Sequence, residues 1–342
     1  MRGGMRRVGL IARADNRGLG QQTWAFYRNM RPAKTLVVDC PSQQPLPLHL
    51  DRFPGATVTS NGFPTRREID EFLDGVDIVY TAETGYGQHL WDAAHQGGVD
   101  TVLHINYEFF VESDRPTVFA APTLWHIEDL PESTIYLPVP IETDRMKPRE
   151  VKSVAASRFL HVVGRPAIHD RNGTPEVFEA LQYVRSDVTV VIACQQRGYV
   201  ESLQRKYRIP DHVTVEVRSI DRVNYWENYL DADALLMPRR FGGLCLPAQE
   251  PVGCGLPVIM PDISPNGWLP ADWLVPASYA GSFDAKQPVD IYLSDPPAVA
   301  ERVDLLAQDA NYYAEAVDKA LLLRRRLSWE TQRAHYAEVF ER

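Results

Sequence analysis

The sequence predicts an α/β protein made of two doubly wound domains, and three observations lead to this fold class. The chain has 342 residues, which suggests about two domains of roughly 150 residues each. Short apolar runs alternate with amphipathic stretches, as in parallel sheets that carry helices on both faces. The alternation restarts near residue 158, after a loop over 138–154. In such folds, ligands bind beyond the carboxyl ends of the strands.

The elements of the first half follow from their hydrophobic patterns. Short runs of apolar residues, bounded by turn residues, predict strands, and apolar residues at helical spacing predict helices. The expected strands are 8–12, 35–38, 56–59, 78–81, 102–105 and 135–137, and the expected helices are 21–30, 65–73 and 87–96.

The second half shows the same alternation. The expected strands are 159–163, 189–193, 213–217, 235–238 and 258–260, and the expected helices are 174–184, 200–207, 223–230, 248–254, 299–307 and 311–327. The stretch 270–297 is rich in proline and is expected to be a loop.

Composition and charge exclude several classes of protein. The net charge of −9 argues against nucleic acid as a partner, because phosphate contacts need clustered lysine and arginine. No apolar run reaches the roughly 18 residues of a membrane span, and 8–12 is too short for a signal peptide. The four cysteines form no C-x-x-C pair and no zinc-like spacing with histidine. We therefore expect a cytoplasmic protein with no metal site.

A glycine-containing loop follows the first expected strand. Gly18 and Gly20 lie where a helix begins, and backbone amides there can hold a phosphate. Three interpretations remain open: a turn that merely needs glycine, a phosphate or sugar contact, and a dinucleotide site. For the dinucleotide site, Asp39 is suitably spaced, but Thr23 stands where the fingerprint has its third glycine.

Arginines and glycines follow two strands of the second half. Arg165 and Arg171 come after 159–163 and suit a diphosphate, because guanidinium groups make charge-assisted bonds to phosphate at any physiological pH. The segment 239–259 contains Gly242, Gly243 and Leu244, whose amides are expected at a helix start, followed by Glu250. We interpret Glu250 as a carboxylate that holds the hydroxyls of a ribose; the alternative is a side chain that merely complements the helix dipole.

These motifs resemble the GT-B glycosyltransferases of the family-4 type, which are retaining enzymes that use nucleotide sugars. The resemblance covers most of residues 137–342 and rests on segments that occur in the family's order. They are Leu137-Pro-Val-Pro-Ile-Glu-Thr-Asp-Arg-Met-Lys-Pro148, Gly164-Arg165 with Arg171-Asn172-Gly173, 220–238, Gly243-Leu-Cys-Leu-Pro-Ala-Gln-Glu250, Gly253-Cys-Gly-Leu-Pro-Val-Ile259 and 327–340.

The resemblance implies a domain organisation and a donor site. Residues 1–150 would form a Rossmann-like acceptor domain, 151–325 a Rossmann-like donor domain, and 326–342 a helix that crosses back to the first domain, with a cleft between the domains. The donor residues would be Gly18, Gly20, Arg165, Arg171, Ile220, Gly242, Gly243, Leu244 and Glu250. Gly242 departs from the family, which has a glutamate there for the donor sugar, and Arg239 and Arg240 lie just upstream.

The chemistry expected is transfer of a hexosyl group from a nucleoside-diphosphate sugar to an unidentified acceptor. Arginines and amides would stabilise the charge that develops on the leaving diphosphate, so neither a divalent metal nor a further cofactor is expected. The motif Asp231-Ala-Asp233 precedes a strand and is interpreted as a turn feature, not as a metal site.

Candidates for the catalytic side come from the first half. Asn106 and Glu108 fall just after the strand 102–105, and Glu83 follows the strand 78–81; His126 lies in an aromatic segment. His104 lies within its strand and is expected to be buried and structural.

Other functions remain open at this point. One is a sugar-nucleotide binder without catalytic activity, suggested by Gly242. Others are a GT-B phosphorylase or epimerase, and an NAD-dependent oxidoreductase based on Gly18, Gly20 and Asp39.

Overall fold

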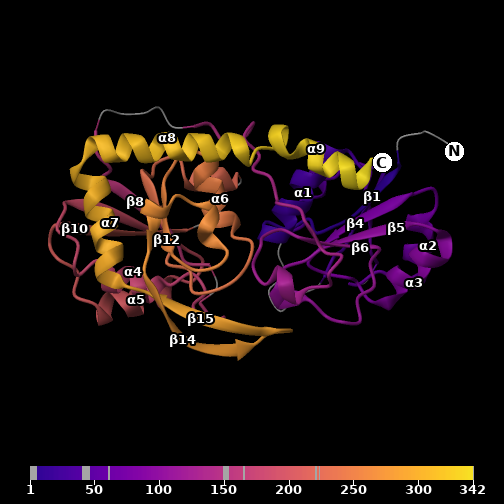
Figure 1. Ribbon diagram of the computed structural model, residues 1–342, viewed down its shortest axis with the longest axis horizontal. Coiled ribbons are helices and arrows are strands. Elements are labelled where there is room, and N and C mark those ends of the chain that lie inside the picture. Colours follow the sequence, from indigo (N-terminus) through magenta and orange to yellow (C-terminus); the bar gives the residue numbers. More distant parts are fainter. Residues whose placement is uncertain are drawn as a thin grey trace. The chain divides into compact units, whose positions relative to one another are not determined.

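The computed structural model describes residues 6–40, 47–60, 62–148, 154–164, 166–219, 222 and 224–341. The chain forms two compact units. The first comprises Met1–Val139, Ala285–Gln287 and Trp329–Arg342, and the second comprises Pro140–Asp284 and Pro288–Ser328. Each unit is built on its own parallel sheet (Figure 1).

The first unit contains a seven-stranded parallel sheet in the order β3-β2-β1-β4-β5-β6-β7. Its strands are β1 (Val8–Ala12), β2 (Lys34–Val37), β3 (Thr57–Val58), β4 (Ile78–Ala82), β5 (Asp100–His104), β6 (Val118–Ala121) and β7 (Ile135–Tyr136). The strand order reverses between β1 and β4, which makes the carboxyl ends of these strands the favoured ligand edge.

Helices α1 (Gly18–Met30), α2 (Arg66–Leu73) and α3 (Gln88–Gly97) connect these strands. Helix α2 begins where the sequence supplies a capping box, since Thr65 Oγ1 accepts from the Glu68 amide and Glu68 accepts from the Thr65 amide. Figure 1 shows α2 and α3 side by side. Short 3₁₀ turns occur at Leu50–Arg52, Tyr107–Phe109 and Ile127–Asp129.

The last helix, α9 (Trp329–Phe340), belongs to the core of the first unit. Phe340 lies edge-on to Phe26 of α1 with ring centroids 5.1 Å apart, and Phe26 in turn stacks on Tyr80 of β4. Tyr336 donates a hydrogen bond to the Pro138 carbonyl. The C-terminal helix therefore supplies aromatic side chains that the core of this unit buries.

The second unit contains a six-stranded parallel sheet in the order β10-β9-β8-β11-β12-β13. Its strands are β8 (Arg158–Val162), β9 (Val188–Cys194), β10 (Val213–Ser219), β11 (Ala234–Leu236), β12 (Val258–Pro261) and β13 (Leu274–Val275). Its helices are α4 (Thr174–Ala180), α5 (Arg197–Lys206), α6 (Leu246–Gly253), α7 (Pro296–Gln308) and α8 (Ala310–Arg326). The order reverses between β8 and β11.

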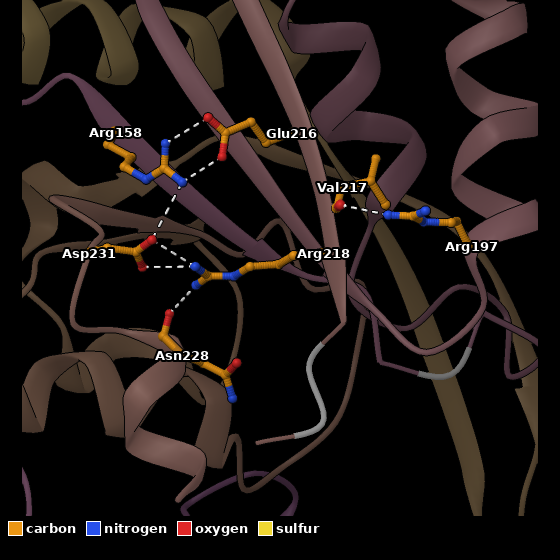
Figure 2. Close-up of polar contacts among 7 residues, drawn as sticks. All are labelled: Arg158, Arg197, Glu216, Val217, Arg218, Asn228 and Asp231. Atoms are coloured by element: carbon orange, nitrogen blue, oxygen red, sulfur yellow. Dashed lines mark hydrogen bonds and ion pairs between the residues drawn. The ribbon is translucent and has the colours of Figure 1, made fainter. Parts of the chain in front are cut away.

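An ion-pair network on this second sheet links β8 and β10 to the turn before β11 (Figure 2). Arg158 binds both carboxylate oxygens of Glu216 and also contacts Asp231, which receives two bonds from Arg218. The side chain of Asp233 accepts from the amides of Ser157 and Arg158, both at 2.8 Å. The Asp231-Ala-Asp233 motif thus binds the amino end of β8 and, through Arg218, the carboxyl end of β10.

Three sequence-based expectations were wrong in detail. The stretch 270–297 is not a loop, because it contains β13 and an antiparallel hairpin of β14 (Ala277–Asp284) and β15 (Pro288–Ser294). Its prolines lie at strand and helix ends, where a missing N–H interrupts no ladder. Residues 225–228 form a 3₁₀ turn in place of the expected helix, and β6 was not foreseen.

Candidate functional site

Two loops of the second unit carry the residues expected to bind a donor. They follow β8 and β11, the strands on either side of the strand-order reversal. Gly173 connects them closely, because a Cβ at this position, whose φ is +68°, would overlap the carbonyl oxygen of Pro238. The Arg240 amide also donates to the Arg171 carbonyl at 2.8 Å. The loop segment 166–173 and the loop 237–245 therefore pack directly against each other, and we call them the donor loops after the ligand that the sequence predicts.

Arg240 fixes this pair of loops through its side chain. Its Nε and Nη2 donate to the two carboxylate oxygens of Glu176 at 2.8 and 2.9 Å, and its Nη1 donates to the His169 carbonyl at 3.0 Å. Glu176 is buried on α4. Arg240 consequently pairs its charge with a buried carboxylate and uses three of its five N–H groups on protein atoms, so its guanidinium has a structural role.

Arg171 and Arg239 converge on Gly242. Nε of Arg239 donates to the Phe241 carbonyl at 2.8 Å and Nη1 donates to the Leu244 carbonyl at 3.1 Å. The Arg171 guanidinium lies 5.0 Å from the centroid of the Phe241 ring. A Cβ at Gly242, which has a φ of +109°, would come 2.6 Å from Nη2 of Arg239 and would also clash with Nη2 of Arg171. The position has to be glycine for the two guanidinium groups to meet there.

Glu250 lies on α6, directly after this loop. Tyr229 donates a hydrogen bond to its Oε2. Burial raises the pKa of the Glu250 carboxyl to about 7, and the nearby charge of Glu142 adds to the effect, while the Tyr229 bond opposes it. A carboxyl with such a pKa changes its protonation state near neutral pH. Nothing in the sequence marked Tyr229 as its partner, because the two residues are 21 positions apart.

The other expected donor residues are placed as follows. Gly243 is buried and Leu244 half-buried, both in the loop immediately before α6. Arg165 and Ile220 lie outside the described residues.

The β14–β15 hairpin packs against the donor loops, a feature that the sequence did not indicate. Phe283 of β14 stacks on His169 with ring centroids 4.2 Å apart and meets Phe241 edge-on at 5.0 Å. The Tyr292 amide of β15 donates to the Arg240 carbonyl at 3.0 Å. The hairpin therefore holds both donor loops from one side.

In the first unit, Gly18 and Gly20 lie in the first turn of α1. A Cβ at Gly20 would overlap the carbonyl of Asp15, so glycine is required for the close approach of the helix to its preceding loop. Thr23 donates to the Arg13 carbonyl at 3.0 Å, which fixes the helix to the end of β1. The turn thus has a packing reason for glycine, and a phosphate contact remains a prediction.

The candidates for catalysis lie after β4 and β5. Asn106 donates to Oε1 of Glu83 at 3.1 Å, and the Glu83 amide donates to the His104 carbonyl at 2.9 Å. Glu83 has a φ of +56°, an uncommon left-handed conformation for a glutamate. Glu108 is buried in the 3₁₀ turn after Asn106. The structure therefore brings Glu83 and Asn106 together.

His126 lies farther along the same unit, in a turn with a φ of +50°. Its ring stacks on Tyr107 at 4.4 Å, and its Nδ1 lies 2.9 Å from Oδ2 of Asp129. Ligand atoms of His126, Glu128 and Asp129 lie within 4.8 Å of one another, but their side chains are half-buried or exposed, as in many acidic clusters that hold no ion.

His104 is buried in β5, as its position within the strand indicated. Its Nε2 lies 2.7 Å from the Leu137 carbonyl and its Nδ1 lies 2.9 Å from the Tyr80 hydroxyl. Burial lowers the pKa of this histidine to about 4, so the ring is neutral at pH 7 and joins three elements of the core.

Comparisons with solved structures identify the fold. Anabaena Alr3699/HepE, determined in complex with UDP and glucose, has a TM-score of 0.72 at 11% identity, covering 98% of this chain and 99% of that one. The chain has the GT-B fold. Sucrose-phosphate synthase (tll1590) from Thermosynechococcus elongatus gives 0.65 at 13% identity, with 97% and 98% covered. AviGT4, a glycosyltransferase involved in avilamycin A biosynthesis, gives 0.59 at 14% identity, with 98% and 97% covered.

By sequence, no protein-family description and no curated protein matches the chain. Within the described residues, no helix is both long enough and apolar enough to cross a membrane.

Proposed function

We propose that this protein is a glycosyltransferase that moves a hexosyl group from a nucleoside-diphosphate sugar to an acceptor. The observation that carries the proposal is the pair of arginines, Arg171 and Arg239, that meets over Gly242 at the carboxyl edge of the second sheet. The GT-B fold alone does not identify a ligand, because one fold hosts many functions. The two arginines are therefore the evidence for an anionic ligand.

The donor site would work by electrostatic stabilisation. Breaking the bond between the sugar and the diphosphate leaves negative charge on the phosphate oxygens. Guanidinium groups held in fixed positions by protein carbonyls stabilise that charge without having to reorganise, and loss of one such donor typically costs about 10²–10³ in rate. Arg171, the amides around Gly243 and, from its sequence position, Arg165 are the groups that we assign to this task.

Glu250 would hold the ribose of the donor. Its carboxylate can accept hydrogen bonds from two vicinal hydroxyls when it is ionised. Because the pKa of this carboxyl is about 7, ribose binding and loss of the proton would be coupled.

The finer points of the reaction rest on the family resemblance and on charge. We propose retention of the anomeric configuration, no divalent metal and no cofactor beyond the nucleotide sugar. HepE has been determined with UDP and with UDP-glucose, so a uridine donor is the first to test. Asn106, Glu108, Glu83 and His126 are proposed to contact the sugar or the acceptor.

The cysteines support a proposal for the cellular compartment. All four, Cys40, Cys194, Cys245 and Cys254, are free thiols, which suits a reducing environment. We therefore propose that the protein acts in the cytoplasm.

A thermal-shift screen against UDP-, GDP- and dTDP-sugars and NAD(P) tests the function. We expect stabilisation by one family of nucleotide sugars, since a ligand that binds only the folded state raises its stability. Stabilisation by NAD alone would contradict the proposed transferase function and favour an oxidoreductase. Incubation of the binding donor with and without acceptors, followed by detection of the released nucleotide, distinguishes an enzyme from a sugar-nucleotide binder, and NMR of the product anomer tests retention.

A further inference from the structure

Arg239 is a buried arginine with incomplete pairing. Its relative exposure is 5%, and its two carbonyl bonds, to Phe241 and Leu244, occupy two of the five N–H groups of a guanidinium. Within the described part of the chain, no carboxylate forms an ion pair with it. Its Nη2, with two N–H groups, donates to no protein atom described and is the atom that points at the space over Gly242.

The neighbouring Arg240, which is half-buried, shows how this chain pairs an arginine whose role is structural. Its guanidinium is bound by both oxygens of Glu176 and by a carbonyl. A buried charge without a counter-charge destabilises a folded protein. The cost is offset when a ligand supplies the missing anion, so the contrast between the two adjacent arginines indicates a binding role for Arg239.

Gly242 opens the space in which this anion would lie. The Nη2 atoms of Arg171 and Arg239 both approach the position that a Cβ of residue 242 would occupy. A φ of +109° excludes most side chains there, so that the space above the backbone stays clear of protein atoms from this residue. Two guanidinium groups that converge on one point repel each other unless an anion lies between them.

We propose that Arg239 and Arg171 form an oxyanion subsite over Gly242 and that Arg239 determines which anionic group of the ligand is recognised. The proposal rests on the proposed function, because the ligand is taken to be a nucleoside-diphosphate sugar. The recognised group is an oxyanion with at least two acceptor oxygens, which matches the fork of a guanidinium. Two parts of such a ligand have this chemistry: the diphosphate, and a carboxylate on the sugar, as in a uronic acid.

The test compares affinities of matched ligands for matched variants. The proteins are the wild type, Arg239→Met and Arg239→Lys. Calorimetry measures their affinities for UDP, UDP-glucose and UDP-glucuronate. If the protein prefers guanine as the base, the ligands are GDP, GDP-mannose and GDP-mannuronate. Arg240→Met is the control, because it removes an equal charge one residue away from Arg239, and the guanidinium that it removes is already paired with Glu176. Circular dichroism and the unfolding midpoint of each variant are recorded, so that titrations use folded protein.

We expect Arg239→Met to weaken binding about tenfold or more for ligands whose oxyanion lies in the subsite. An equal loss for UDP and both UDP-sugars identifies the diphosphate, whereas a loss confined to UDP-glucuronate identifies the sugar carboxylate. Arg239→Lys should recover part of the affinity, since it keeps the charge but not the fork. Arg240→Met should lower the unfolding midpoint and weaken the binding of all three ligands by one common and smaller factor, because it loosens both loops without removing a group from the subsite.

Unchanged affinities in Arg239→Met, for nucleotides that the wild type binds, would overturn the subsite while leaving the transferase function intact. Equal losses in Arg239→Met and Arg240→Met would also overturn it, because the effect would then be one of loop structure. If the wild type binds no UDP-, GDP- or dTDP-sugar in the thermal-shift screen, the proposed function fails, and the subsite fails with it.

Discussion

Glu250 illustrates how a single half-buried carboxyl couples folding, binding and pH. Its pKa of about 7 results mainly from burial. The folded state holds a proton that the unfolded chain has already released at pH values between about 4.5 and 7. The stability from this group is therefore complete below about pH 4.5 and is lost as the pH rises through about 7.

The ionisation of Glu250 predicts a pH dependence of donor binding. If ribose hydroxyls donate to the carboxylate, the affinity for UDP-glucose should rise about tenfold between about pH 6 and pH 8, because the ionised fraction of a group with a pKa of about 7 rises by that factor. Calorimetry at the two pH values measures it, and UDP-glucose is suitable because its doubly esterified diphosphate does not titrate in this range.

Glu250→Gln is the variant for comparison. It should bind UDP-glucose more weakly at pH 8 and show no pH dependence across this range. A wild-type affinity that is flat with pH, or a variant that binds as tightly as the wild type, would remove the ribose assignment.

Gly173 is a residue whose role is decided by the space around it. With a φ of +68° and the Pro238 carbonyl in the way of a Cβ, Gly173→Ala should lower the free energy of unfolding by about 1–3 kcal/mol. Gly198 is the matched control: it lies in α5, and a Cβ there would meet nothing within 4 Å. Gly198→Ala should raise stability by about 0.5–1 kcal/mol, since alanine favours helix. Urea denaturation measures both, and an equal effect of the two substitutions would contradict the packing argument.

At the scale of elements, the Asp231-Ala-Asp233 turn shows two aspartates with different tasks. Asp233 is buried and accepts from two backbone amides, whereas the side chain of Asp231 is 47% exposed within the network of Figure 2. Asp233→Ala leaves buried amides without a partner and should cost about 2–3 kcal/mol of stability. Asp231→Ala should cost less than about 1 kcal/mol, because exposed ion pairs contribute little.

The same two aspartate variants also test whether the Asp231-Ala-Asp233 motif is only a structural turn or binds a metal ion. We expect both variants to be unaffected by added Mn²⁺ in donor binding and turnover. Activity that depends on Mn²⁺ in the wild type and is lost in both variants would show that the motif binds metal.

The β14–β15 hairpin is the element that sequence patterns described worst. Its strands are largely exposed or half-buried, and Val289 and Ser294 are their buried residues, so they lack the apolar alternation that predicts a strand. Their prolines read as loop signals, although they stand at the ends of the elements. Contacts of Phe283 with His169 and Phe241, and the hydrogen bond from Tyr292 to Arg240, give the hairpin its position on the donor loops.

At the scale of the whole molecule, the two units have separate hydrophobic cores. Phe340 is fully buried in the first core, so Phe340→Ala should destabilise that unit by about 3–5 kcal/mol. Hydrogen exchange should show lost protection in β1 and β4 but not in β8 and β9. Leu322→Ala, at a 64% exposed leucine of α8, is the control and should change little. Equal loss of protection in both units would mean that they unfold together.

The sequence by itself determined the fold class, because strands buried on both faces and amphipathic helices have periodicities that local pattern reveals. It also located the glycines and arginines of the candidate donor loops, since these follow predicted strands. It did not determine the partners of those residues. Arg240 pairs with Glu176, whereas Arg239 pairs only with carbonyls. Glu250 accepts a hydrogen bond from Tyr229. These pairings depend on side chains that the fold brings together from different elements. Such pairings are decided only by tertiary packing, because burial and the direction of a long side chain depend on neighbours that are distant in the sequence.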